Sequence, residues 1–525
     1  MNSGKKLPIG VQSFQNIRLD QYIYVDKTEY IFQLKESGSQ FFLSRPRRFG
    51  KSLLLSTMRA YWEGKKELFS GLSIERLEEG KPEAWKSYPV FYFDFNRDSY
   101  QSAGALEGIL DAHLKEWETV YGCTDREASL AVRFQHLLVR AQKQSGLRCV
   151  VLVDEYDKSL LEAMENAELE EHNKAVFKGF FSALKSYDAY LQFVFITGVT
   201  KFSKISIFSD LNQLNDISFS KQYAGMCGIT EAELKSSFSE EITRLAEEYE
   251  LSSAVCLQKL RSTYDGYRFN VGGPSVYNPF SLLNAFYHLK FGYYWFGSGT
   301  PTFLVRRLRE IDFDIRRFTT QELFATEGEL SDCRGDNPDP VPLLYQTGYL
   351  TLKEYDEDAD YYSLGYPNDE VKYGFLESLM PEYTGNTGTR SGTDIFTLKR
   401  KIENADLDGI RDILMALFAG IPYPSHSVPF EHDFQSVIYL VFTLLGKQIK
   451  CELHSARGRA DCVAETEKYV FLFEFKLDDS AETALKQIQE KGYAIPYIAD
   501  QRRVFKIGVG FDSEMRTLTD WKVEE

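Results

Sequence analysis

Four short apolar runs constrain the fold of this chain more than any other feature. They are FFLSR (41–45), VFYFDF (90–95), CVVLVD (149–154) and QFVFIT (192–197), and all are rich in Val, Phe, Ile or Leu. Because they are hydrophobic on both faces and alternate with helix-like segments, they belong in a buried, mainly parallel sheet covered by helices. YAGMCGIT (223–230) is a weaker fifth candidate. The first part of the chain is therefore expected to be an α/β domain.

The pattern changes after this region. EAELKSSFSEEITRLAEEYEL (231–251) has an apolar stripe opposite charged residues, which predicts helices, and YLTLKEYDEDADYYSLGY (349–366) predicts a hairpin. PEYTGNTGTRSGTD (381–394) is poor in apolar residues and indicates a loop or linker. Beyond it we expect a helix, EHDFQSVIYLVFTLLG, then two strands, GRADCVAE and YVFLFEFK, a helix, AETALKQIQEKGY, and a last strand, VFKIGVGF. We predict three parts, 1–230, 231–385 and 395–525.

Composition limits the class of protein. The 525 residues are enough for about three domains, and 43% hydrophobic residues are ample for packed cores. A formal charge of -16 argues against a surface that is basic throughout, although it leaves room for a local basic groove. The seven cysteines form no CxxC pair and are expected to be reduced thiols. No secretion signal or membrane-spanning run is visible, so we expect a cytoplasmic protein.

The first apolar run leads into RPRRFGKSLLLS (45–56). The second half of a phosphate-binding loop, Gly50-Lys51-Ser52, is present, but Arg45 stands where its first glycine is expected. Lys51 would reach the β- and γ-phosphates, Ser52 would hold Mg²⁺, and the backbone N–H groups ahead of the helix would cradle the anion. Taken alone, the GKS tripeptide is also compatible with a solvated turn before a helix.

A second strand end supplies carboxylates for the same site. CVVLVD ends in Asp154 and is followed by Glu155, so Asp154 is placed to hold Mg²⁺ through water and Glu155 to orient an attacking water. Thr197 and Thr200 follow the next apolar run and would lie beside Asp154, as sensors of the γ-phosphate or as simple strand-end hydrogen bonds. Two such strand ends in this order favour a nucleotide site.

A separate group of charged residues lies near the C-terminus. Asp461 is on one expected strand, and Glu474 and Lys476 share one face of the next, because they are two residues apart. A turn at ETEK pairs the strands, so Asp461 can lie across from Glu474. Two carboxylates beside a lysine suit Mg²⁺ and the hydrolysis of a phosphodiester. Charges inside the apolar run YVFLFEFKL need a partner, which favours this interpretation over an ordinary solvated strand face.

Further residues fit this group. Glu431 begins the preceding helix and could be an extra metal ligand, and Gln487 in the following helix could orient Lys476 or contact a nucleic-acid backbone. Positive charge that would suit a phosphate backbone comes from Arg457, Arg459, Lys486 and Lys491.

Several blocks of the sequence resemble a known family. LPIGVQSFQNIRLDQYIYVDKTEYI, RPRRFGKSLLLSTMRAYWEGK, VDEYDK, TGVTKFSKISIFSDLNQLNDIS and YDGYRF are similar to the AAA-ATPase-like family of gut and anaerobic bacteria, in which the RPRRFGKS form of the loop is usual. The C-terminal hairpin resembles the PD-(D/E)XK nuclease superfamily domain that commonly follows this ATPase. Asp461, Glu474 and Lys476 match its signature, and Glu431 and Gln487 match the flanking positions; the departure is that Asp461 follows Arg-Ala where the signature has Pro.

This resemblance implies a P-loop NTPase core with a helical lid, a mixed middle region and a C-terminal restriction-endonuclease-like α/β domain. It implies ATP and Mg²⁺ as cofactors, and nucleic acid, DNA before RNA, as partner; a homo-oligomer is left open because such ATPases often use a neighbour's arginine. The nucleotide-binding residues implied by the match are Arg47, Arg48, Phe49, Gly50, Lys51, Ser52, Leu53 and Asp154. Arg47 and Arg48 are equally compatible with solvated side chains or a contact to a partner subunit.

Two functions follow from the sequence. The first is an ATPase coupled to a Mg²⁺-dependent nuclease, with Glu155, Asp461, Glu474, Lys476 and Gln487 as catalytic residues and Ser52, Asp154, Glu431, Asp461 and Glu474 as metal ligands. The alternative is an ATP-dependent switch or scaffold whose nuclease-like domain binds partners or nucleic acid without cutting. The intact Asp461, Glu474 and Lys476 set favours the enzyme.

Overall fold

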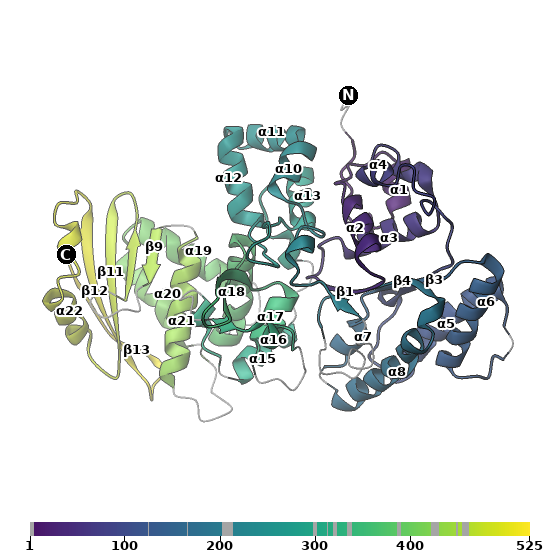
Figure 1. Cartoon of the computed structure of the whole chain (residues 1–525). Coiled ribbons are helices and arrows are strands. Elements are labelled where there is room, and N and C mark those ends of the chain that lie inside the picture. Colours follow the sequence, from purple (N-terminus) through teal and green to yellow (C-terminus); the bar gives the residue numbers. More distant parts are fainter. Residues whose placement is uncertain are drawn as a thin grey trace. The chain divides into compact units, whose positions relative to one another are not determined.

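The computed structural model describes residues 5–123, 125–164, 166–201, 214–297, 302–311, 313–318, 323–332, 339–385, 390–419, 421, 430–447, 450–453 and 461–525. The chain forms two compact units (Figure 1). Unit 1 comprises 1–295 and 321–370, and unit 2 comprises 296–320 and 371–525. The expected middle part, 231–385, is thus shared between the units, and the three-part division stays a prediction.

Unit 1 is built on a five-stranded parallel sheet with the strand order β2-β3-β4-β1-β5. The strands are β1 (Gln40–Ser44), β2 (Val90–Asp94), β3 (Cys149–Asp154), β4 (Leu191–Gly198) and β5 (Asn215–Asp216). Every residue of β3 is buried, as its continuous apolar run requires of a central parallel strand. The parallel arrangement brings the C-terminal ends of β1, β3 and β4, and the polar residues that follow them, to one edge of the sheet.

Helices cover both faces of this sheet (Figure 1). The helices α5, α6 and α8 pack with the sheet in one core of aromatic and aliphatic residues, and α3 packs on β2 and β3. Their bounds are α1 (Phe14–Leu19), α2 (Thr28–Ser37), α3 (Lys51–Trp62), α4 (Ser73–Leu77), α5 (Ala105–Tyr121), α6 (Leu130–Ser145), α7 (Lys158–Leu161) and α8 (Ala167–Ser186).

The rest of unit 1 is a helical cluster and a small antiparallel sheet. Residues of α10 (Glu231–Ser237), α11 (Ser239–Glu248), α12 (Ser253–Tyr264) and α13 (Pro279–His288) share a hydrophobic core. The sheet has the order β6-β8-β7, and its β7–β8 pair is the hairpin expected from the sequence. The remaining elements are α14 (Tyr294–Gly297), β6 (Phe324–Ala325), α16 (Glu327–Leu330), α17 (Val341–Thr347), β7 (Thr351–Asp356) and β8 (Tyr361–Gly365).

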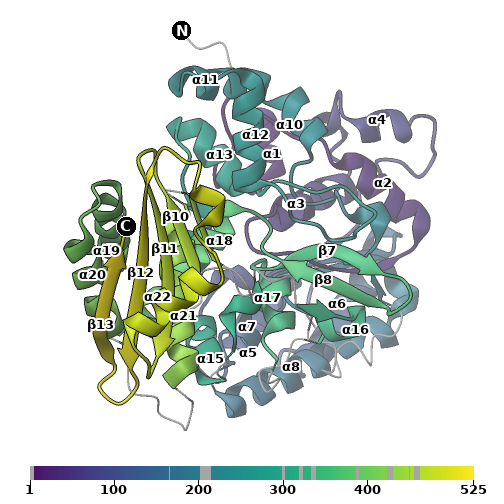
Figure 2. The same ribbon diagram turned by 90° about the vertical axis from the view of Figure 1, so that its left-hand side faces the viewer.

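Unit 2 contains a second five-stranded sheet, with the order β13-β12-β11-β10-β9. β11 and β12 are parallel and the other pairs are antiparallel. Helix α22 covers one face of this sheet, and α19, α20 and α21 lie on the other (Figure 2). The elements are α15 (Thr302–Glu310), α18 (Asp369–Thr384), α19 (Arg390–Glu403), α20 (Leu407–Ala419), α21 (Phe430–Leu445), β9 (Lys450–Leu453), β10 (Cys462–Glu465), β11 (Tyr469–Leu477), α22 (Ala481–Glu490), β12 (Arg503–Asp512) and β13 (Thr517–Glu524).

The mixed α/β fold class is confirmed, but three local expectations were wrong. The fifth strand is β5 at Asn215–Asp216, and 223–230 forms turns with a single bridge from Ile229 to Tyr277. The expected linker 381–394 is helical at both ends, since α18 continues through Pro381 to Thr384 and α19 begins at Arg390. The expected last strand is followed by another, β13. Of the described helices, none is both long enough and apolar enough to cross a membrane.

Candidate nucleotide and metal sites

The loop between β1 and α3 has the backbone form of an anion cradle. Gly50 lies in the left-handed region with φ of 90° and is the N-cap of α3, and Arg48 also has a positive φ, 69°. Glycine adopts this conformation without strain, whereas an arginine there is held by its surroundings. The free N–H groups at the start of the 12-residue helix α3 face the same end as this loop. Backbone of this form favours a negatively charged ligand.

Lys51 lies across this loop and is almost fully buried. Its Nζ donates to the carbonyl oxygens of Arg45 at 2.9 Å and Pro46 at 3.1 Å. Both acceptors are neutral, and among the residues that the structure describes no carboxylate lies within hydrogen-bonding distance of the Lys51 ammonium. An ammonium group held in this way is placed to receive a phosphate oxygen.

Arg45 replaces the expected glycine for a structural reason. Its guanidinium is buried and donates to the carbonyls of Ser44 and Ser218, both at 2.8 Å, and of Tyr223 at 3.2 Å. It also lies 4.0 Å from the ring centre of Phe269. Burial lowers the pKa of Arg45. Arg45 therefore ties the end of β1 to the segment after β5. The loop that has Arg45 in place of glycine is held by these contacts.

Aromatic residues far along the chain hold the rest of the loop. The Phe49 ring is buried against Tyr267 and Phe269, with ring centres 4.7 and 5.7 Å apart. The Trp295 indole N–H donates to the Arg47 carbonyl at 3.1 Å. Arg48 lies over a ring as well, 4.7 Å from the centre of Phe280. The side chains of Arg47 and Arg48 are otherwise exposed, and Leu53 is half-buried at the start of α3.

Asp154 and Ser52 meet at the adjacent strand end. Asp154 is buried and accepts hydrogen bonds from Thr197 Oγ1 at 3.1 Å and the Tyr92 hydroxyl at 3.2 Å. Burial raises the pKa of Asp154 to about 6, and the hydrogen bond from Ser52 acts in the opposite direction. A carboxylate that burial makes unfavourable to ionise, next to a hydroxyl, suits a hydrated divalent cation. These residues therefore fit Mg²⁺ bound with a nucleotide.

Glu155 and Asp157 complete this strand end in different ways. Glu155 is half-buried with a positive φ of 51°. Asp157 is buried and accepts from the N–H groups of Val199 and Thr200 and from the Thr200 hydroxyl, at 2.6–3.1 Å. A Cβ at Gly198 would lie 2.6 Å from Asp157 Oδ1, so the close approach of the Asp157 side chain to residue 198 requires glycine.

Sequence reasoning missed Asp157 and expected Thr200 to lie beside Asp154. In the structure Thr200 contacts Asp157, while Thr197 contacts Asp154 as expected. Asp157 and Thr200 stand directly after two neighbouring parallel strands, so the two strand ends themselves could have indicated the contact.

The second site forms where β10 and β11 pair. The register Cys462↔Phe473 places Asp461 opposite Glu474. Asp461 Oδ2 accepts from the Phe475 N–H at 2.9 Å, and the Asp461 N–H donates to Glu474 Oε2 at 3.3 Å. Glu474 is 1% exposed. Burial raises the pKa of both carboxyl groups, and for Glu474 the negative charge of Asp461 raises it further.

Lys476 and Gln487 join the same group. Lys476 Nζ donates to Glu474 Oε1 at 3.0 Å and to Gln487 Oε1 at 2.7 Å. The Gln487 amide N–H₂ donates to Glu474 and, at 3.3 Å, to the hydroxyl of Tyr493. The structure therefore brings four of the five expected residues together. The side chain of the fifth, Glu431, lies outside the described residues, as do Arg457 and Arg459.

The donor set fits a divalent cation. Two carboxylates in contact, both with raised pKa values, are stabilised when a cation neutralises them. Within the described part of the chain, no three His, Cys, Asp or Glu side chains come together, so Asp461 and Glu474 form a pair.

Comparisons with known proteins match two regions of this chain. A family model described as predicted AAA-ATPase matches residues 8–208, and one described as PD-(D/E)XK nuclease superfamily matches 429–521. A relative from Azotobacter chroococcum mcd 1, called "Uncharacterized protein in vnfD 5'region", is 36% identical over 537 residues, covering 99% of each chain. The chain belongs to the AAA-ATPase-like family with a C-terminal PD-(D/E)XK nuclease superfamily domain. No solved structure matches this chain.

These matches place the two sites in the family's two domains. The loop at 45–53 and Asp154 lie in the AAA-ATPase-like part, and Asp461, Glu474, Lys476 and Gln487 lie in the PD-(D/E)XK part. The resemblance inferred from the sequence is confirmed. An ATPase-like and a nuclease-like domain in one chain indicate enzymatic potential of both kinds.

Proposed function

We propose that this protein binds ATP with Mg²⁺ at the loop of unit 1. We further propose that it cleaves nucleic-acid phosphodiesters, with DNA as the first candidate, at the residue cluster around Asp461 and Glu474 in unit 2. The observation that carries this proposal is the hydrogen-bonded set Asp461, Glu474, Lys476 and Gln487. A scaffold that only binds partners gains nothing from two carboxylates in contact, one of them buried and both with raised pKa values, beside a lysine. This favours cleavage over binding alone.

At the loop of unit 1, ATP would be held by the chain's own donors. The backbone N–H groups from Arg47 to Leu53 would surround the phosphates, and Lys51 would exchange a backbone carbonyl for a phosphate oxygen. Ser52 and Asp154 would hold Mg²⁺, which supplies charge neutralisation between the phosphates when bound. Glu155 would orient a water molecule for attack on the γ-phosphate. The exposed guanidinium groups of Arg47 and Arg48 would stabilise charge on the phosphates.

In unit 2, Asp461 and Glu474, with Glu431, would hold a divalent cation. When bound, such a cation would polarise the phosphate and lower the pKa of a water molecule. Lys476 is placed to stabilise negative charge on the reacting phosphate and to orient a water. Gln487 keeps Lys476 in position, because it accepts from that lysine and donates to Glu474. These roles need no residue from unit 1.

The test is cleavage of a panel of labelled nucleic acids. Wild-type protein with Mg²⁺ or Mn²⁺ is expected to nick or degrade at least one single- or double-stranded DNA or RNA, and EDTA is expected to stop this. Glu474→Gln keeps the shape of the side chain but removes its charge, and should lower the rate by about 1,000-fold. Glu467→Gln, in the exposed turn of the same hairpin, is the matched control. Equal cleavage by the wild type and Glu474→Gln would reject the site.

A further inference from the structure

Two cysteines on neighbouring strands of unit 2 contact each other. Cys451 lies on β9 and Cys462 on β10, and their sulfur atoms are 3.4 Å apart. Cys149 and Cys256 of unit 1, by comparison, each donate to a backbone carbonyl. Cys451 and Cys462 are 11 residues apart in the sequence, and the pairing of their strands brings them together. Two thiols in contact are the arrangement from which a disulfide forms.

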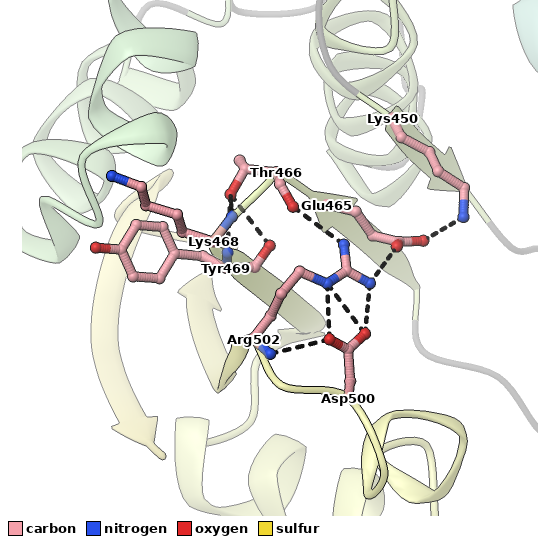
Figure 3. Close-up of polar contacts among 7 residues, drawn as sticks. All are labelled: Lys450, Glu465, Thr466, Lys468, Tyr469, Asp500 and Arg502. Carbon is pink, nitrogen blue, oxygen red and sulfur yellow. Dashed lines mark hydrogen bonds and ion pairs between the residues drawn. The ribbon is translucent and has the colours of Figure 1, made fainter.

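The register of β9 and β10 holds this contact. Cys451 lies opposite Ala464, and Cys462 is two residues before Ala464, so both cysteines are on one face of the sheet. Beside them, Lys450 forms an ion pair with Glu465 across the same two strands (Figure 3). The contact between the thiols is therefore part of the strand pairing.

Exposure differs between the two thiols. Cys451 is half-buried on β9, at the edge of the described sheet, whereas Cys462 is fully buried on β10. Oxidation of a thiol depends on its exposure, so a small oxidant reaches Cys451 first. Side chains alternate along β10, so Cys462 lies on the face opposite to Asp461. A reaction of the thiols therefore reaches the carboxylates through the backbone.

The backbone links the thiols to the residue cluster around Asp461 and Glu474. The strand order β11-β10-β9 puts Cys451 on one side of β10 and Glu474 on the other, and Asp461 directly precedes Cys462. A disulfide bond is about 2.0 Å long, so the two sulfurs must approach by about 1.4 Å. This approach draws Cys462 toward β9 and away from β11. It stretches the hydrogen bonds of Asp461 to Glu474 and Phe475, now 3.3 and 2.9 Å, whereas a binding site needs its groups placed to within about 0.5 Å.

We propose that hydrogen peroxide joins Cys451 and Cys462 in a reversible disulfide, and that this bond lowers the affinity of the neighbouring carboxylates for a divalent cation. Cys451 Sγ attacks one peroxide oxygen, the O–O bond breaks, and the thiol becomes a sulfenic acid while one water leaves. Cys462 Sγ then attacks Cys451 Sγ, and the displaced hydroxide leaves with the Cys462 proton as a second water. Two thiols lose two electrons, and one peroxide is reduced to two water molecules.

A dithiol reverses the bond by thiol–disulfide exchange. The loss of cation affinity rests on the proposed function of unit 2 and adds its regulation, whereas the disulfide itself does not depend on that function.

The test uses the full-length protein, reduced with dithiothreitol, freed of it and then treated with hydrogen peroxide. Peptide mapping by mass spectrometry should find a cross-link between Cys451 and Cys462 that dithiothreitol removes. Isothermal titration should give an Mn²⁺ affinity about tenfold lower after oxidation, the scale on which displaced support of a metal ligand acts. The titration uses the Asp154→Asn protein, so that the metal ligand of unit 1 does not contribute.

Two variants accompany the wild type. Cys451→Ala should form no cross-link, and its Mn²⁺ affinity should not respond to peroxide. Cys123→Ser, which removes a half-buried cysteine of unit 1, is the matched control and should behave like the wild type.

Three results would overturn the inference. One is a wild type that forms no cross-link between the two cysteines after peroxide treatment. The second is a cross-linked protein with unchanged Mn²⁺ affinity. The third is an equal loss of Mn²⁺ affinity in Cys451→Ala, which would assign the effect to oxidation elsewhere. Reduced protein that neither binds Mn²⁺ nor cleaves any nucleic acid rejects the proposed function of unit 2 instead, and the peptide map then decides on the disulfide separately.

Discussion

The two sites hold their lysines in different ways. Lys51 in unit 1 donates to two neutral backbone carbonyls, whereas Lys476 in unit 2 donates to the carboxylate of Glu474 and to the amide of Gln487. The first arrangement leaves a positive charge available for an anion. The second leaves one positive charge beside two carboxylates, so the group as a whole attracts a cation. A lysine therefore favours an anion at the first site and belongs to a group that favours a cation at the second, because its hydrogen-bond partners differ.

The sites also differ in how far along the chain their supports lie. The loop of unit 1 depends on Ser218, Tyr223, Phe269 and Trp295, which lie far from it in sequence. The group in unit 2 is made within one hairpin and the helix that follows it, from Asp461 to Gln487. A site of the first kind depends on the packing of its whole unit, while the second depends mainly on strand register.

Replacement of Lys476 or Lys51 by alanine should have the largest effects on cleavage rate and on ATP affinity, respectively. Lys476→Ala should lower the cleavage rate by about 1,000-fold and leave ATP affinity unchanged, because general acid–base and charge-stabilising groups contribute on this scale. Lys51→Ala should lower ATP affinity by about 100-fold, since a charged partner of the phosphates is lost. Cleavage rates and equilibrium ATP binding measure both.

The controls for this pair are exposed lysines of the same units, Lys66→Ala and Lys468→Ala. Neither control should change ATP affinity by more than a small factor. If Lys51→Ala binds ATP like the wild type, the loop is not the nucleotide site.

Arg45→Gly restores the glycine of the usual loop and should nevertheless destabilise unit 1. Three hydrogen bonds from a buried guanidinium are lost, at a cost of about 3 kcal/mol in the free energy of unfolding. Arg48→Gly, in the same loop, should change stability little, because Arg48 has a positive φ that suits glycine. Thermal unfolding of the two variants compares them, and an equal effect would refute the role of Arg45.

Asp154→Asn should change how stability depends on pH in the absence of nucleotide and metal. Burial raises the pKa of Asp154 from 3.8 to about 6, so the folded state favours the protonated carboxyl. The stabilisation from this group is complete below about pH 4 and is lost as the pH rises through about 6. Relative to the wild type, Asp154→Asn should therefore gain about 2 to 3 kcal/mol between pH 4 and 8.

This pH series has a matched control in Asp98→Asn, an exposed carboxyl after β2. Its thermal midpoint should follow the wild type at every pH. A constant difference between Asp154→Asn and the wild type across the series would show that Asp154 is not a buried, raised-pKa group.

Arg502→Ala should have the smallest effect. The residue binds Asp500, Glu465 and the Thr466 carbonyl at the base of the hairpin (Figure 3), but the Arg502 and Asp500 side chains are partly exposed. A modest fall in the thermal midpoint is expected, with cleavage retained, because partly exposed ion pairs contribute little. A loss of stability as large as that of Arg45→Gly would contradict the view that unit 2 depends mainly on strand register.

The sequence was most informative where contacts are local. Two-residue periodicity and a short turn were enough to place Asp461 opposite Glu474 and Lys476 beside it, and apolar runs located the central strands. The buried role of Arg45 could not be predicted, because Ser218 and Tyr223 come from distant segments. β5 was missed because a two-residue strand has no periodicity, and α18 continues through Pro381, which local composition opposes.

The most direct test of two independent sites measures ATP binding and nucleic-acid cleavage in parallel on the wild type, Asp461→Ala and Lys51→Ala. The account predicts that Asp461→Ala loses Mg²⁺-dependent cleavage and binds ATP like the wild type, while Lys51→Ala loses ATP binding. Unchanged cleavage by Asp461→Ala, or loss of ATP binding in that variant, would contradict it.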